Sequence, residues 1–161
     1  MKKTTLSIGE ISSGTLRSID LAESMVYDLR KLRLSKEERK AVREAERAIE
    51  AYNGADEGEE SAETLEALDY AVNESLPNIM DAHCPPYCYY GNLEGDGACF
   101  GVWPSMEAIQ NDMDEGEILI LDDEEEIPRA YSGYAVDTND HGNMTLFRYT
   151  RGRRYEVWAV V

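Results

Sequence analysis

Three stretches in the N-terminal half carry apolar residues three or four positions apart, the spacing that places them on one face of an α-helix. The first predicted helix spans 18–33. The second begins at Ser35, where Glu38 completes a capping box, and ends at Asn53-Gly54. The third begins near Ser61. The apolar positions of the three helices are Ile19, Ala22, Val26 and Leu29; Val42, Ala45, Ile49 and Tyr52; and Leu65, Leu68, Val72, Leu76 and Ile79.

Beyond Pro77 the pattern changes to the alternation that is typical of β-strands. A Gly-rich loop at 92–97 joins the first two strands into a hairpin with a long tip, and the last three strands form an antiparallel meander. Pro104 suits the first turn of a short helix that ends at Met113. Residues 4–11 are also expected to be extended. The predicted strands of this half span 87–91, 98–103, 118–121, 132–137, 144–150 and 155–161.

Helices followed by strands predict an α+β fold, with three N-terminal helices packed on one antiparallel sheet of about five to six strands. The 161 residues suffice for a single domain, mainly helical over 1–80 and mainly β over 81–161, whose core needs neither disulfide nor metal. Large apolar side chains alternate along 144–149, so both faces of the meander are apolar. Helices on both faces explain this pattern. This is the favoured interpretation, and a partner or a second copy on the second face, as in a homodimer or an oligomeric scaffold, is the alternative.

Charge is distributed very unevenly along the chain, which has a net charge of −17. No Lys or Arg lies between Arg47 and Arg129, yet this stretch holds 22 of the 33 acidic residues. Such a negative field repels phosphates and acidic membranes and attracts a basic protein surface. The charge pattern therefore argues against direct binding of nucleic acid or membrane through this region and favours a basic partner.

Other features of the composition indicate a protein of the cytoplasm. No apolar run approaches the 18 or so residues of a membrane span, and no apolar block follows the basic tip of the N-terminus. The three cysteines, an odd number, fit a reduced compartment better than a disulfide framework. We therefore expect a cytoplasmic chain without export signals.

One candidate metal site combines soft ligands from the middle of the chain. Its four residues are His83, Cys84, Cys88 and Cys99, enough donors for tetrahedral zinc. Cys84 and Cys88 are four positions apart, which in an extended segment separates them by about 13 Å. Buried structural cysteines are the favoured interpretation, and neither a metal nor a cofactor is predicted.

A second candidate site lies at the loops of the β half. Asp96 sits in the Gly-rich hairpin loop, and Asp140 and His141 place a carboxylate beside an imidazole, as general acid–base catalysis requires. Tyr87 and Trp103 could line a ligand site with Asp96 and His141. Turn geometry explains the same loop residues, and no nucleophile has a local signature. Catalysis at these positions is therefore the alternative, and a non-enzymatic protein is favoured.

A third candidate is a surface of carboxylates for binding a partner. Glu63 and Glu66 lie three apart on the third predicted helix, about 5–6 Å between side-chain bases, so carboxylates on one face can stand in for the phosphates of DNA. A solvated acidic loop is the other interpretation of the run at 122–126. The candidate partner-binding residues are Glu57, Glu59, Glu60, Glu63, Glu66, Glu74, Asp122, Asp123, Glu124, Glu125 and Glu126.

Several motifs of the chain resemble small acidic proteins that are encoded on phages and plasmids. They are Gly14-Thr-Leu-Arg17, Pro86-Tyr-x-Tyr-Tyr-Gly91, Gly95-Asp-Gly-Ala-x-Phe-Gly-x-Trp-Pro104, Asn139-Asp-His-Gly-Asn143-x-Thr-Leu and Glu156-Val-Trp-Ala-Val. The resemblance covers the C-terminal half and the opening, and it supplies no catalytic residue. It implies an accessory protein of a mobile element that acts inside a bacterial host.

Together these observations predict a non-enzymatic acidic protein that competes with nucleic acid for a basic surface of a host defence protein. By analogy with other mobile-element accessories, it would be of the antirestriction or anti-CRISPR type, a DNA mimic in a host–virus interaction. A ligand-binding protein or enzyme with a site at the β-half loops, and an oligomeric scaffold, are the alternatives.

Overall fold

A computed structural model describes residues 2–56, 58–121 and 127–160. The chain divides into two compact units. The first unit contains the residues up to Cys84 together with Cys88–Pro104, and the second contains Pro85–Tyr87 together with the chain from Ser105 onward. The prediction of a single domain stays a prediction.

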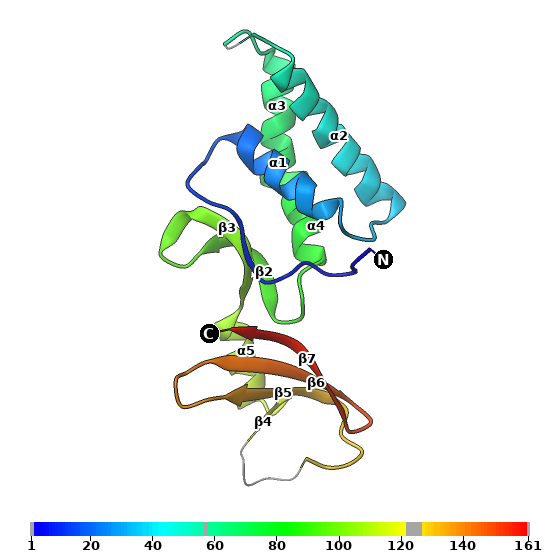
Figure 1. Cartoon of the computed structure of the whole chain (residues 1–161), viewed down its shortest axis with the longest axis vertical. Helices are drawn as coiled ribbons and strands as arrows, with labels where there is room; N and C mark the ends of the chain where they lie inside the picture. Colours follow the sequence, from blue (N-terminus) through cyan, green and yellow to red (C-terminus); the bar gives the residue numbers. More distant parts are fainter. Residues whose placement is uncertain (1, 57, 122–126, 161) are drawn as a thin grey trace. The chain divides into compact units, whose positions relative to one another are not determined.

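The helices of the first unit form where the apolar periodicity predicts them (Figure 1). Helix α1 spans Ser18–Leu29 and α2 spans Lys36–Asn53. Helix α3, Ala62–Tyr70, continues through a π-helical turn, η1, at Ala71–Ser75 into α4, Leu76–Ala82. The first predicted helix is shorter than expected. The third is longer, because the helical run continues through Pro77, which lies in the first turn of α4 directly after the π-helical turn.

The N-terminus of α2 has the capping box that the sequence predicts. The Ser35 Oγ accepts the N–H of Glu38 at 3.1 Å, and the Glu38 carboxylate accepts the N–H of Ser35 at 2.6 Å. At the start of α3 the Ser61 Oγ likewise accepts the N–H of Thr64. These bonds satisfy backbone donors that a helix leaves open at its first turn, which is why the helices begin at these serines.

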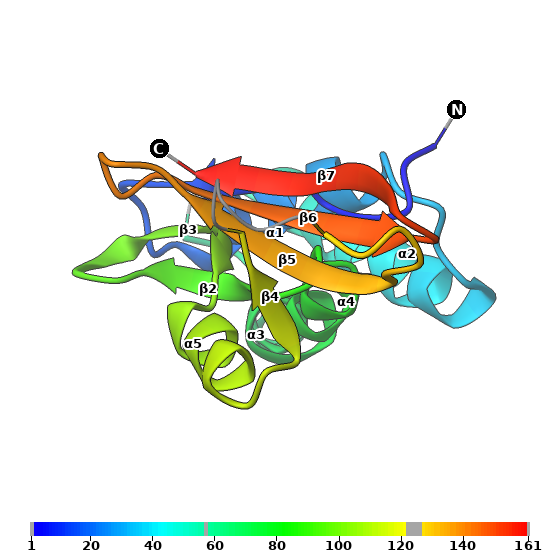
Figure 2. The same ribbon diagram turned by 90° about the horizontal axis from the view of Figure 1, so that it is seen from below.

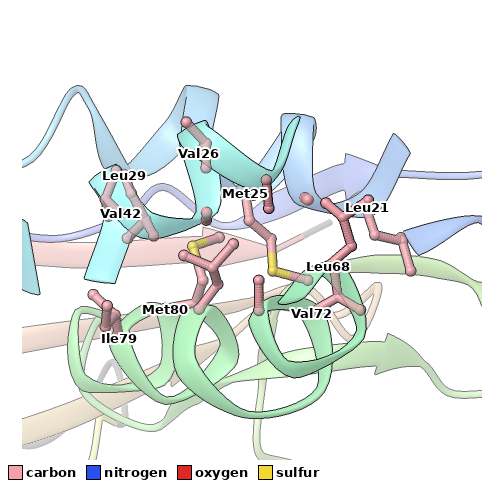
Figure 3. Packing of buried hydrophobic residues seen from close by; sticks show 14 of the residues in the cluster. Leu21, Met25, Val26, Leu29, Val42, Leu68, Val72, Ile79 and Met80 are labelled. Atoms are coloured by element: carbon pink, nitrogen blue, oxygen red, sulfur yellow. The ribbon is translucent and has the colours of Figure 1, made fainter. Parts of the chain in front are cut away.

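The core of the first unit lies between the helices (Figure 3). Leu29 of α1, Leu68 of α3, and Leu76 and Met80 of α4 have at most 1% of their surface exposed. Val42 brings in α2. Because apolar side chains from four helical segments share one cluster, each helix is held in place by its neighbours.

A three-stranded antiparallel sheet completes the first unit. Its strands are β1 (Gly9–Ser12), β2 (Cys88–Leu93) and β3 (Asp96–Pro104), in the order β1-β3-β2. Leu93 pairs with Asp96, so only Glu94-Gly95 remain at the hairpin tip. The long tip predicted at 92–97 is therefore wrong. Gly95, with φ of +84°, supplies the left-handed conformation that lets the strands run this far.

In the part of the second unit that the structure describes, one helix accompanies a four-stranded sheet. Helix α5 spans Met106–Asp114, and the strands are β4 (Ile118–Ile120), β5 (Gly133–Thr138), β6 (Met144–Thr150) and β7 (Arg153–Val160). Figure 2 shows the strands side by side in the order β4-β5-β6-β7. Strands β4 and β5 are parallel, and the other two pairings are antiparallel, as the meander predicts.

The residues around Pro86 belong to the second unit because their polar atoms bond there. The indole N–H of Trp158 on β7 donates to the Pro86 carbonyl at 2.9 Å, and the N–H of Ser105 donates to the Tyr87 carbonyl at 2.8 Å.

One apolar cluster of the second unit's sheet joins Phe147 to residues of the segment before β5. The segment before β5, which includes Ile127 and Tyr131, thus packs against this part of the sheet. The other members of the cluster are Leu119, Leu121, Ala135 and Tyr149.

The α+β class is confirmed, whereas the prediction of one antiparallel sheet of five to six strands is wrong. Within the described residues, the strands form two sheets of three and four strands, and the β4–β5 pairing is parallel. Strand β1, from the extended N-terminal segment, pairs with β3 of the hairpin. The first strand of the meander, β5, pairs with β4 and not with a strand of the hairpin. No helix within the described ranges is long and apolar enough to cross a membrane.

Candidate functional site

The acids predicted to bind a partner lie, where they are described, on the first unit. Glu59 and Glu60 precede α3, Glu63 and Glu66 lie on α3, and Glu74 lies in η1. Glu57 and the run Asp122–Glu126 fall outside the described residues.

Three of these acids share one side of the α3–η1 helix, which we call the acidic stripe: Glu63, Glu66 and Glu74. All three are exposed, whereas Leu68 and Val72 of the same helix are buried in the core. The helical period therefore directs the carboxylates away from the core. Glu63 and Glu66 are three residues apart, which keeps their side-chain bases about 5–6 Å apart, and Glu74 follows eight residues later, about 12 Å along the helix. Tyr70 lies between Glu66 and Glu74 on this line, 65% exposed.

Acids of the N-terminal segment have local counter-charges, and the acidic stripe has none among the described residues. Arg30 holds Glu46 at 2.7 Å, and Lys40 holds Glu44 at 3.6 Å. No ion pair between two described residues involves an acid from Glu50 to Glu117. The stripe therefore presents charge that described side chains leave unneutralised. The remaining N-terminal ion pairs are Arg17–Asp20 and Lys31–Asp28, and Glu38 lies 3.0 Å from the His83 Nε2.

The arrangement of the acids suits an extended partner better than a metal ion. In the parts of the chain that the structure describes, no three His, Cys, Asp or Glu side chains converge as a metal would require. The carboxylates instead follow one another along a helix whose opposite side is packed in the core. Such a row can bind a row of Lys and Arg side chains.

The candidate metal ligand His83 is engaged in the fold of the first unit. Its Nδ1 lies 2.9 Å from the Thr4 carbonyl, and its Nε2 lies 3.0 Å from Glu38 Oε1. The Leu6 N–H also donates to the His83 carbonyl. His83 thus joins the N-terminal segment to α2 and to the end of α4.

The surroundings of the three cysteines raise the pKa of each thiol. Burial raises the pKa of Cys84 and of Cys88 to about 12, and Asp81 adds to the effect at Cys84. Burial and the nearby Glu10 raise the pKa of Cys99. Since the thiolate is the nucleophile and the metal ligand, these sites favour the unreactive thiol at neutral pH.

Glu38 is expected to make stability depend on pH in the acid range. Burial acts to raise its pKa, but hydrogen bonds from Ser35 and His83 outweigh burial and hold the pKa below its ordinary value. A carboxyl with a lowered folded pKa stabilises the fold above its unfolded pKa, about 4.3, and loses this contribution as pH falls through the folded pKa. Glu38→Gln should therefore cost about 0.5–1.5 kcal/mol near pH 7 and less below pH 4.

Urea titrations between pH 3 and 7 measure this difference. The control is Glu37→Gln, because Glu37 is exposed in the same helical turn. A Glu38→Gln penalty that is constant over this range would contradict the assignment.

The residues of the predicted loop site are mostly occupied by local bonds. The Trp103 indole donates to the Gly91 carbonyl at 3.0 Å, and the Asp96 carboxylate accepts the Ala98 N–H at 3.0 Å. Asp140 and His141 lie exposed in a turn that the Asn139 side chain closes by accepting the His141 N–H. Asp96 belongs to the first unit and His141 to the second, so their convergence stays a prediction.

Tyr87 has a structural position that the sequence does not signal. Its hydroxyl donates to Asp112 of α5 at 2.6 Å, and its ring meets Tyr134 of β5 edge-on at 5.4 Å. Burial, and then Asp112, raise the pKa of Tyr87. Its φ of +60° is uncommon for a bulky residue. Tyr87 therefore joins helix and sheet of the second unit, and Asp112 and Tyr134 are partners that no sequence pattern marks.

Comparison with known proteins adds no assignment to this geometry. No family model, no curated protein and no solved structure matches the chain. The resemblance of its loops to proteins of phages and plasmids stays a prediction. The acidic stripe is therefore the feature on which a function can be built.

Proposed function

We propose that this chain is a non-enzymatic binding protein whose acidic stripe occupies a basic, nucleic-acid-binding surface of a host protein. The neighbouring Glu59 and Glu60 would extend the same surface. The proposal includes the mobile-element origin, the bacterial cytoplasm and the antirestriction or anti-CRISPR role that the sequence motifs imply by resemblance.

The observation that carries this proposal is the contrast between the two sets of acids in the first unit. Ion pairs with Lys or Arg hold Asp20, Asp28, Glu44 and Glu46 in the N-terminal segment, whereas the acids of the acidic stripe have no basic partner among the described residues. Like charges in a row destabilise a helix slightly, and ordinary surfaces mix both signs. A row of carboxylates on a packed helix is therefore better explained by a partner that neutralises it.

The mechanism is electrostatic competition. Carboxylates fixed on a packed helix meet Lys and Arg side chains that would otherwise hold phosphates, so the acidic protein and nucleic acid exclude each other. Opposite charges speed the encounter, and dissolved salt screens them over about 8 Å at physiological ionic strength. Binding should therefore be fast and should weaken as salt rises.

A competition experiment tests the proposal. Bacterial proteins eluted by salt from a duplex-DNA resin are mixed with a fluorescent 20-bp duplex, and the chain is titrated in while anisotropy reports release of the duplex. Glu63→Gln/Glu66→Gln/Glu74→Gln should raise the concentration for half-release at least about tenfold, one order of magnitude corresponding to 1.4 kcal/mol. Several pairs of charges are lost together, and each exposed pair contributes about 0.2–1 kcal/mol.

The matched control removes the same number of charges elsewhere. Glu94→Gln/Glu107→Gln/Glu115→Gln changes three exposed acids that lie outside the acidic stripe. This variant should release the duplex almost as well as the wild-type chain. Equal losses in the two variants would show that net charge, and not the stripe, drives release, and the proposal would then fail.

A further inference from the structure

A second charged row, opposite in sign, runs along α2. Lys36, Lys40, Arg43 and Arg47 are exposed, and steps of four, three and four residues keep them within one side of the helix. Val42, Ala45 and Ala48 are buried on the opposite side. We call these four cations the basic stripe. The spacing of these four cations is visible in the sequence, but the negative net charge of the whole chain gives no indication of a basic surface.

The two stripes have matching lengths. The basic stripe runs over twelve residues from Lys36 to Arg47, and the acidic stripe over twelve residues from Glu63 to Glu74, each about 16 Å long at the rise of a helix. Each is directed away from the core that α2 and α3 share, so the two rows cannot meet within one copy. Only Lys40 has a counter-charge in a described ion pair, a weak exposed contact with Glu44.

We propose that the basic stripe of one copy binds the acidic stripe of a second copy of this chain. The side chain of Tyr70, 65% exposed between Glu66 and Glu74, would then lie against a Lys or Arg of the facing helix. Cations stack favourably on aromatic faces, and Tyr and Arg are enriched at interfaces. The proposal does not rest on the partner proposed above, because it concerns this chain alone.

The charge distribution favours a second copy over nucleic acid as the occupant. Helix α3 packs beside α2, and packed helices are about 8–10 Å apart, so phosphates laid along the basic stripe would run near the acids of the adjoining helix. A second copy brings carboxylates in a short row of the same length, without a continuous phosphate chain.

The strength of this association follows from exposed ion pairs. Such pairs are individually weak, and two copies of net charge −17 repel each other at long range, so association is expected at about 0.1–1 mM protein. It should be visible near 150 mM NaCl, where long-range repulsion is screened, and lost near 1 M NaCl. Each copy carries both stripes, so contacts can close a pair or extend a chain, and both raise the measured mass.

Sedimentation velocity of the full chain with charge-reversed variants tests the proposal. Lys36→Glu/Lys40→Glu/Arg43→Glu leaves two acidic rows, and Glu63→Lys/Glu66→Lys/Glu74→Lys leaves two basic rows. Each variant alone should sediment as a monomer where the wild type associates. Their equimolar mixture should associate again, because each row then faces a row of opposite sign.

Circular dichroism establishes that each variant keeps its helices. If a reversed variant is unfolded, Lys36→Gln/Lys40→Gln/Arg43→Gln replaces it and should lower the association constant at least about tenfold. The proposal is overturned if the wild type stays monomeric up to about 1 mM, if the variants associate as the wild type does, or if the mixture of folded reversed variants stays monomeric. Binding of a labelled 20-bp duplex that the basic-stripe variant loses would assign the stripe to nucleic acid and also overturn it.

Discussion

Replacing Leu76 by alanine is expected to lower the free energy of unfolding of the first unit by about 2–5 kcal/mol. Leu76 has none of its surface exposed, and it lies in the cluster shared by α1, α2, α3 and α4. Removing its buried methyl groups costs both the transfer of those groups from water and a cavity that neighbours fill only in part. The loss is large because Leu76 is fully buried within this cluster.

Urea unfolding followed by Trp103 fluorescence measures the effect. The chain has two tryptophans, Trp103 in the first unit and Trp158 in the second, so Trp158→Phe isolates the first signal. Leu65→Ala is the control, because Leu65 is 44% exposed on the same helical run and should cost less than about 1 kcal/mol. Equal costs at the two positions would contradict the described core.

Gly152→Ala is expected to destabilise the second unit by about 2–5 kcal/mol. Gly152 adopts φ of +75°, and a Cβ there would lie 2.2 Å from the Arg129 carbonyl oxygen. The left-handed conformation costs an alanine about 1–2 kcal/mol, and moving packed backbone costs about 1–3 kcal/mol more. The Gly152 N–H also donates to the Tyr131 carbonyl at 2.9 Å, so the turn cannot move freely.

Gly142→Ala separates these two causes. Gly142 has φ of +81°, but a Cβ there meets no atom within 4 Å, so only the conformational cost remains. Trp158 fluorescence in a Trp103→Phe background reports unfolding of the second unit. Equal destabilisation by the two alanines would show that the contact with Arg129 is absent. If Gly152→Ala also shifts the Trp103 transition, the two units unfold together, as the prediction of a single domain requires.

Secondary structure could be predicted from local patterns because each element carries its own signals. The capping box at Ser35 and Glu38 and the apolar row through Val42 mark α2 without any knowledge of its neighbours. Alternation likewise marks β6, whose bounds of Met144–Thr150 coincide with the prediction. Pairing of strands that follow one another through a short turn could also be predicted, as in the hairpin and the meander. The pairings of β1 with β3 and of β4 with β5 could not, because an edge strand can satisfy several partners and periodicity does not say which.

The candidate site could be predicted in part for the same reason. Helical period alone places Glu63, Glu66 and Glu74 on one side of α3–η1. Long-range contacts were not accessible from the sequence. The hydrogen bond between Tyr87 and Asp112 joins residues 25 positions apart, and the Tyr87 backbone has a φ of +60°, in the left-handed region. The contact between His83 and Glu38 joins residues 45 positions apart. The predicted run Asp122–Glu126 lies outside the described residues and is not assessed by the structure.

The central claim, that one row of carboxylates and not net charge binds a basic partner, is tested most directly by the duplex-release titration of two variants equal in charge. The claim predicts that neutralising Glu63, Glu66 and Glu74 raises the half-release concentration at least about tenfold over the Glu94, Glu107 and Glu115 control. Half-release at the same concentration for both variants would contradict it.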